Sequence, residues 1–227
     1  MSEAAPGYPD QIAYVSPERA RLAETVRALI DATMTIPDAT ADQLLAAATR
    51  VEAVTAALSG AIDRRLGAGY TPRGHGDYLP RSPVVGDASP LAPGTVDWEM
   101  VADRDGGPHS LRCVASAVMT AAYEGPPGFV HGGMIALFFD EILGIANIAN
   151  GCPGMTGALT IRYRRPTPLY QPLRWEAWVE RVEGRRVRSR AKVWHGETLC
   201  AEADGVFVQP SEALRREYFG DRPDPAA

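Results

Sequence analysis

A pair of glycines and a carboxylate in one apolar segment form the first group of residues that could do chemistry. Gly132 and Gly133 open a run of mostly apolar residues that predicts a helix, and they leave the backbone N–H groups of its first turn accessible. An acyl oxygen could approach these groups at the positive end of the helix macrodipole. The pattern therefore predicts an oxyanion hole.

Asp140 lies about two turns further along the same predicted helix, among phenylalanine and aliphatic residues. An isolated carboxylate is costly to bury in such surroundings, so a functional reason is expected. A carboxylate can attack an acyl carbon to form an anhydride, or it can take the proton from an attacking water. The residues leave both routes open. His131 precedes the glycine pair, and we favour a structural hydrogen bond over proton transfer as its role.

Other kinds of chemistry lack their required residues. The chain contains no GxGxxG, GxxxxGK[ST], HExxH or GxSxG motif, so neither a nucleotide cofactor nor a serine nucleophile is predicted. The remaining histidines are isolated and the cysteines form no CxxC pair, so we expect neither a metal nor a cofactor.

Composition limits the partners and the compartment. A net charge of -5 disfavours binding to nucleic acid or to an anionic membrane surface. The chain has three widely spaced cysteines, which are typical of free thiols in a reducing compartment. It begins without the pattern of a secretory signal and contains no uninterrupted apolar run of roughly 18 residues. We therefore expect a cytoplasmic protein without a membrane span.

Residues 1–66 are predicted to form an N-terminal helical extension with two amphipathic helices. Ser16 and Pro17 have the character of a helix start, and a second cap is expected between Asp38 and Thr40. Residues 67–93 are rich in glycine and proline and predict a connector that runs over the surface. The main domain is expected at residues 94–210, followed by a tail at 211–227.

Hydrophobic periodicity changes from about 3.6 to 2 at the start of the main domain. Alternating apolar residues predict a hairpin over about 96–117, and a nearly all-apolar stretch predicts a buried helix over about 132–148. Four further strands are expected at about 159–163, 173–182, 187–194 and 199–208. This order predicts an α+β domain in which an antiparallel sheet covers one central helix.

Two segments of the main domain resemble a known family. The first, from Glu124 to Glu141, reads EGPPGFVHGGMIALFFDE and resembles the signature of the phenylacetyl-CoA thioesterase-like branch of the hotdog family, in the 4-hydroxybenzoyl-CoA thioesterase superfamily. The second, from Thr156 to Leu169, reads TGALTIRYRRPTPL and is similar to the strand after the helix in the same proteins. The likeness spans about residues 91–210. It implies a hotdog fold and hydrolysis of acyl-CoA thioesters.

The resemblance also implies roles for individual residues. It makes Asp140 the nucleophile or general base, Gly132 the amide that polarises the thioester carbonyl, and Thr156 a hydroxyl that orients water. The chain departs from the family pattern upstream of His131, where relatives can carry a water-holding Asn and this chain has Glu124-Gly125. Glu124 is therefore a candidate second carboxylate at the site.

Contacts to the substrate are expected from apolar and basic residues near the motifs. We expect Gly133 to contact the acyl oxygen and Phe129, with Phe138 and Phe139, to line or shorten an acyl pocket. The CoA phosphates require cations. The first candidates are Arg162, Arg164 and Arg165, and the later ones are Arg185, Arg186, Arg188 and Arg190. The resemblance further implies a homodimer or a dimer of dimers with the acyl site between protomers.

Two other functions stay open at this point. One is a hotdog hydratase or dehydratase acting on acyl-CoA, which needs a His and an acid placed at neighbouring acyl carbons. The other is a non-catalytic acyl-CoA binder in which the N-terminal helices contact a partner. Asp140 within its motif favours hydrolysis over both.

Overall fold

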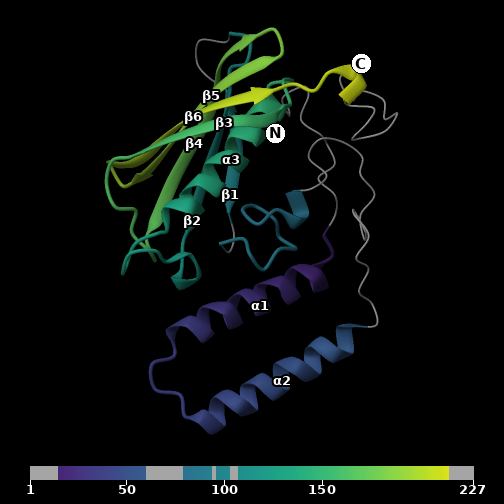
Figure 1. Ribbon diagram of the computed structural model, residues 1–227, viewed down its shortest axis with the longest axis vertical. Helices are drawn as coiled ribbons and strands as arrows, with labels where there is room; N and C mark the ends of the chain where they lie inside the picture. The colour runs from purple at the N-terminus through teal and green to yellow at the C-terminus, as the bar shows by residue number, and fades with distance from the viewer. Residues whose placement is uncertain (1–14, 60–78, 94–95, 103–106, 215–227) are drawn as a thin grey trace.

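The main domain is a six-stranded antiparallel sheet that wraps around one long helix (Figure 1). The computed structural model describes residues 15–59, 79–93, 96–102 and 107–214. Within these residues the strand order is β1-β2-β4-β5-β6-β3. The strands are β1 (Asp97–Ala102), β2 (Leu111–Val118), β3 (Met155–Tyr163), β4 (Pro172–Glu183), β5 (Arg186–His195) and β6 (Thr198–Val208). This is the hotdog arrangement that the sequence predicts.

Alternation along the strands gives the sheet one face toward the helix and one toward solvent. In β4 the side chains of Leu173, Trp175 and Ala177 are fully buried, while the residues between them are exposed or half-buried. The two tight turns of the meander lie at Gly184 and Gly196, which both have positive φ angles that glycine adopts without strain.

The central helix α3 (Gly132–Ala149) fills the concave side of the sheet. Phe138 stacks on Trp175 of β4 with ring centroids 4.1 Å apart, and Phe139 meets the same ring edge-on at 5.2 Å. Among the described helices, α3 is the one long and apolar enough to cross a membrane, by length and composition alone. A helix that packs in the core of a domain meets the same criterion, and half of this one is buried.

The two predicted N-terminal helices are α1 (Pro17–Thr35) and α2 (Ala41–Ser59). The Ser16 side chain caps α1, and a reciprocal pair of hydrogen bonds between Thr40 and Gln43 caps α2. The helix α1 lies against the main domain near the short 3-10 helix η2 (Ala121–Tyr123), and α2 lies outside it with no buried residue (Figure 1).

Polar contacts fix α1 to the main domain. The Arg27 guanidinium donates to the carbonyl oxygens of Ala92 at 2.8 Å and Ser89 at 3.1 Å. Tyr170 precedes β4, and its hydroxyl lies 3.4 Å from a carboxylate oxygen of Asp31. The first helix is therefore anchored at two places on the domain.

The expectation of a surface connector does not hold for residues 79–93. Leu79, in the 3-10 helix η1 (Leu79–Arg81), and Val84 belong to the same buried cluster as α3 and the sheet, and Ala92 is fully buried. Irregular segments can fill a core when their apolar residues suit the gap, although they show no periodicity. Residues 67–78 lie outside the described part of the chain, as do 60–66 of the predicted helical extension and 215–227 of the predicted tail. The domain boundaries stay predictions.

Candidate active site

The N-terminus of α3 is fixed by His131, which caps the helix. Its Nδ1 accepts the Gly133 N–H at 2.9 Å, and its own backbone N–H donates to the Tyr123 carbonyl at 2.8 Å. The neutral ring therefore carries its proton on Nε2. This geometry matches the structural role that we favoured for His131.

The Gly132 amide is held so that it points away from the helix. The carbonyl oxygen of His131 accepts from Met134 N–H at 2.9 Å and from Ile135 N–H at 3.2 Å. In a planar trans peptide the Gly132 N–H points opposite to that carbonyl. Two donors on the carbonyl also polarise the peptide and strengthen its N–H as a donor.

Of the two glycine amides predicted for the oxyanion hole, the structure leaves one available. The Gly133 N–H is used by His131, whereas the Gly132 N–H has no hydrogen-bond partner within the residues that the structure describes. An acyl oxygen can therefore approach Gly132, while contact with Gly133 would first require the loss of its bond to His131.

Asp140 and Thr156 form a hydrogen-bonded pair about two helical turns, or about 12 Å, along α3 from Gly132. The Thr156 hydroxyl, at the start of β3, donates to Oδ1 of Asp140 at 2.7 Å. Asp140 is half-buried and follows the fully buried Phe139, so its carboxylate leaves the core toward β3. Its Oδ2 has no hydrogen-bond or ionic partner among the described residues and is available for proton transfer or attack.

The adjacent Glu141 points into the domain instead. One of its carboxylate oxygens is buried, and its charge acts on the Cys113 thiol of β2. Burial, with a smaller contribution from Glu141, raises the pKa of Cys113 to about 12, so this thiol stays protonated and is a poor nucleophile. Burial likewise raises the pKa of Cys152 to about 11. Neither of these thiols competes with Asp140 for a catalytic role.

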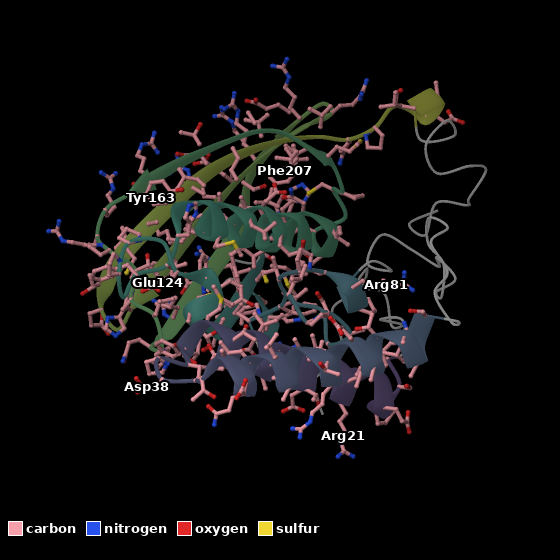
Figure 2. The ribbon with its side chains drawn as sticks, turned by 60° about the horizontal axis from the view of Figure 1, so that its bottom comes forward. Arg21, Asp38, Arg81, Glu124, Tyr163 and Phe207 are labelled. Atoms are coloured by element: carbon pink, nitrogen blue, oxygen red, sulfur yellow. The ribbon has the colours of Figure 1, made fainter. Side chains whose placement is uncertain are left out.

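The Glu124 side chain forms a hydrogen bond within its own loop. Its carboxylate accepts the Gly128 N–H at 2.7 Å, and its backbone bridges to Val130. Figure 2 shows Glu124 and Tyr163 toward the same end of the domain. The role of Glu124 as a second carboxylate of the site stays a prediction, because this bond already uses one of its oxygens.

Gly125 has no space for a side chain. A Cβ atom built on it would lie 2.7 Å from the His131 Cα and 3.1 Å from the His131 Cβ. The backbone of the loop packs directly against the residue that caps α3.

Replacement of Gly125 by Ala should destabilise this loop. The added methyl group must push the His131 backbone away, and overpacking of this kind costs about 1–3 kcal/mol. Thermal melts of Gly125→Ala and of Gly128→Ala, whose glycine has open space but a φ of 80°, would separate overpacking from backbone strain. An unchanged Tm for Gly125→Ala would contradict the tight contact.

Apolar side chains are exposed around the candidate site. Phe129 is 37% exposed, whereas Phe138 and Phe139 are buried in the core against Trp175 and do not line an open pocket. Three further exposed apolar residues come from α3 and β3, and they are Leu137, Met155 and Tyr163. The sequence patterns did not assign a role to Tyr163.

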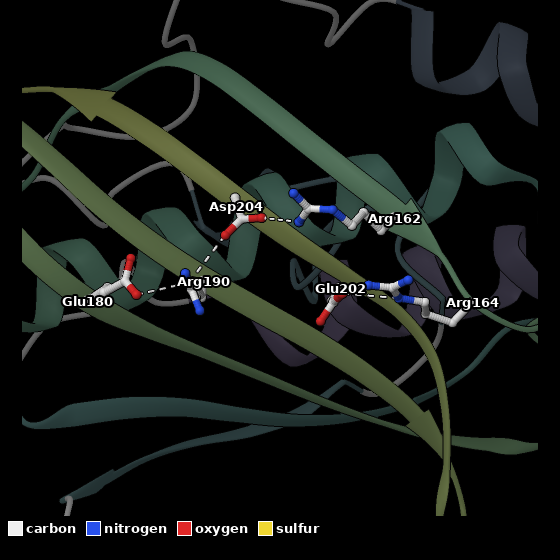
Figure 3. A network of polar contacts seen from close by, with 6 residues as sticks. All are labelled: Arg162, Arg164, Glu180, Arg190, Glu202 and Asp204. Atoms are coloured by element: carbon white, nitrogen blue, oxygen red, sulfur yellow. Dashed lines mark hydrogen bonds and ion pairs between the residues drawn. The ribbon is translucent and has the colours of Figure 1, made fainter.

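The predicted CoA-binding arginines lie on the other face of the sheet. Arg162 and Arg164 alternate with Tyr163, which contacts α3, so they point outward and form ion pairs with Asp204 and Glu202 (Figure 3). The same outer face carries Arg188 and Arg190, and Arg190 pairs with Glu180 at 3.0 Å and with Asp204 at 3.2 Å. The structure therefore does not bring these arginines to Asp140.

Arg165 follows β3 and is exposed, with one guanidinium nitrogen 3.2 Å from the Arg164 carbonyl. Arg185 donates to the Gln209 carbonyl at 2.9 Å. No carboxylate lies within ion-pair distance of Arg165 among the described residues. The contact of any arginine with CoA stays a prediction.

Comparisons with known proteins agree with this fold. Residues 127–202 match the thioesterase superfamily. The crystal structure of a thioesterase superfamily protein superimposes with a TM-score of 0.72 at 29% identity, covering 88% of this chain and 94% of that one. The main domain has the hotdog fold, and its residues 127–202 are similar to the thioesterase superfamily. That alignment covers more of this chain than the main domain alone, so it extends into the N-terminal region.

Two curated relatives match part of this chain. Acyl-coenzyme A thioesterase THEM4 of Xenopus laevis is 38% identical over 89 residues, which are 38% of this chain and 40% of the relative. The protein of the same name from Mus musculus is 35% identical over 88 residues, 38% of each chain. The chain thus matches less than half the length of these relatives.

Proposed function

We propose that the protein hydrolyses acyl-CoA thioesters to a free acid and CoA. The observation that carries the proposal is the available Gly132 amide on the same helix as a carboxylate, Asp140, whose orientation is fixed by Thr156. The names of the curated relatives support the substrate class.

In the proposed reaction the thioester carbonyl oxygen accepts the Gly132 N–H, which stabilises the negative charge that develops on it. Gly132 and Asp140 of one chain are about 12 Å apart along α3, so the carboxylate that acts on this thioester is Asp140 of a second copy of the chain, through its free oxygen Oδ2. As a general base it takes a proton from water, the hydroxide adds to the acyl carbon, the C–S bond breaks, and the proton passes to the CoA sulfur. As a nucleophile it attacks the acyl carbon, the C–S bond breaks and CoA leaves as the thiolate; water then hydrolyses the anhydride to the free acid and Asp140, and supplies the proton that the thiolate takes up. Thr156 holds Oδ1 in both routes.

The proposed site is completed by a second copy of the chain. The strand β3 pairs with β6 on one side, leaves its other edge unpaired within the described residues, and is exposed along most of its length. Such an edge favours pairing with another chain. A homodimer through β3 would cover Met155 and Leu137 beside Asp140, so the acyl group would lie between protomers.

The proposed location is the cytoplasm, because Cys113, Cys152 and Cys200 are all free thiols buried in the domain. Cell fractionation with an antibody against the protein would test this location, and recovery from an oxidising compartment would contradict it.

A panel of acyl-CoA substrates with a free-thiol readout tests the activity. We expect kcat/KM to be higher for medium, long or aryl acyl groups than for acetyl, since each buried methylene contributes about 0.8 kcal/mol, roughly fourfold in affinity. Sizing of the same preparation measures the oligomeric state. Binding of acyl-CoA without thiol release would contradict hydrolysis, and the highest kcat/KM on acetyl-CoA would contradict the acyl preference alone.

A further inference from the structure

Tyr163 ties the last residue of β3 to the first residue of α3. Its hydroxyl donates to the Gly132 carbonyl oxygen at 2.8 Å. The ring also lies against Gly132, because a Cβ atom built there would be 3.2 Å from the tyrosine oxygen and 3.3 Å from Cζ. Tyr163 is 54% exposed, so burial in the core does not explain its position.

We propose that Tyr163 is a positioning residue for the oxyanion-binding amide of Gly132, acting through the backbone without touching the substrate. This inference rests on the proposed thioester hydrolysis. It assigns a function to a residue outside the helix that carries Gly132 and Asp140.

Hydrogen bonds fix the two consecutive peptide groups at Gly132. The first peptide, from His131 to Gly132, is fixed on its carbonyl side by the amides of Met134 and Ile135. The second, from Gly132 to Gly133, is fixed on its N–H side by His131 Nδ1 and on its carbonyl side by Tyr163. Two glycines adopt many backbone conformations, so these contacts are needed to keep the Gly132 N–H in one direction.

The Tyr163 bond also strengthens its neighbour. A donor on the Gly132 carbonyl polarises that peptide and makes the Gly133 N–H a better donor to His131. The result is a chain of hydrogen bonds from the tyrosine hydroxyl through one peptide to the imidazole. Tyr163 therefore acts on both residues that flank the available amide.

The strand β3 holds the site at two points. Thr156 near its start binds Asp140, and Tyr163 at its end binds Gly132. Side chains of the same strand therefore hold the carboxylate of Asp140 and the peptide group of Gly132, and this sets the placement of these two groups within one chain. A displacement of reacting groups by about 1 Å can cost on the order of 10²-fold in rate.

Tyr163→Phe removes the hydroxyl and keeps the ring against Gly132. We expect kcat to fall about tenfold, less than for loss of an oxyanion donor itself, with KM changed less than about twofold. In ¹H–¹⁵N spectra of the full chain, the Gly132 and Gly133 amide resonances should move, since the hydrogen bond to the carbonyl of the Gly132–Gly133 peptide is lost.

The matched control is Tyr170→Phe, in which another exposed tyrosine loses its hydroxyl. That hydroxyl accepts the Ala121 N–H at 3.0 Å and lies on the side of the domain that faces α1. This variant should keep wild-type kcat and unchanged Gly132 and Gly133 resonances, and thermal melts of both variants would report any loss of stability.

Wild-type kcat in Tyr163→Phe, or unmoved Gly132 and Gly133 resonances, would overturn the inference. A fall in kcat that only follows a fall in Tm would also overturn it. The spectra separate this inference from the proposed function: a wild-type protein that releases no thiol refutes hydrolysis, while the amide resonances still decide whether Tyr163 positions Gly132.

Discussion

Asp140→Asn should lower kcat for acyl-CoA hydrolysis on the order of 10²–10⁴-fold, the range typical of a lost acid–base group. The amide keeps the shape of the side chain and can still accept the Thr156 hydroxyl through its oxygen, so the local geometry should persist. The position of Oδ2 is taken by an NH₂ group, which can neither accept a proton from water nor attack the acyl carbon. The fold should be unaffected because Asp140 is half-buried and lies outside the core cluster.

Glu141→Gln is the matched control on the neighbouring residue. Adjacent helical residues point about 100° apart, and Glu141 turns toward Cys113 and the sheet. We expect far less loss of kcat for Glu141→Gln than for Asp140→Asn. Any effect of this variant should appear in the thermal melt, since one of its carboxylate oxygens is buried.

Steady-state kinetics of both variants on the best substrate of the panel, with matched melts, would measure this difference. Near-normal turnover by Asp140→Asn would refute the proposed mechanism. A large loss of kcat in Glu141→Gln with an unchanged Tm would move the catalytic role to Glu141.

The sequence predicted the main domain well because its elements are regular. The apolar residues of α3 surround most of the helix, and such a helix can only be stable when it is buried. The predicted strands 173–182, 187–194 and 199–208 differ from β4, β5 and β6 by few residues at either end. For β3 the prediction began near Leu159, whereas the strand begins at Met155, because a bulge between Thr156 and Ala158 interrupts the alternation.

The sequence could predict only those parts of the candidate site that lie within one helix. Gly132 and Asp140 belong to one helix, so their spacing in the sequence already defines their relation in space. The role of Tyr163 depends on which face of β3 approaches the helix, and the same choice places Arg162 and Arg164 on the opposite face. Local periodicity does not define how a strand end meets a helix end, because that contact depends on tertiary packing.

The segment from residue 79 to 93 shows a second limit of sequence patterns. Its prolines and glycine break any periodicity, and this favoured a surface connector. The structure buries Leu79 and Val84 within the core cluster and also buries the polar side chains of Ser82 and Ser89. The Ser82 hydroxyl accepts the N–H groups of Val84 and Val85, so the irregular backbone is satisfied by its own side chain.

A chain that begins at Ser89 should therefore lose its cooperative thermal transition. The sequence alone had suggested that such a chain would fold, because few contacts were expected across the connector. The burial of a side chain such as Leu or Val contributes about 1.5–3 kcal/mol, and the cavity left behind adds to the loss. Loss of Leu79 and Val84 together is then comparable with the total stability of a domain, about 5–15 kcal/mol.

A chain that begins at Leu79 is the matched control. It lacks α1 and α2 but keeps the segment that completes the core, so it should melt cooperatively, with a Tm below that of the full chain. The decrease reflects the loss of the Arg27 bonds to Ser89 and Ala92 and of the cover that α1 gives to η2. Circular dichroism melts and sizing of the three chains would test this order. A Ser89 chain that melts as cooperatively as the Leu79 chain, at the same Tm, would show that residues 79–88 contribute nothing to the stability of the core.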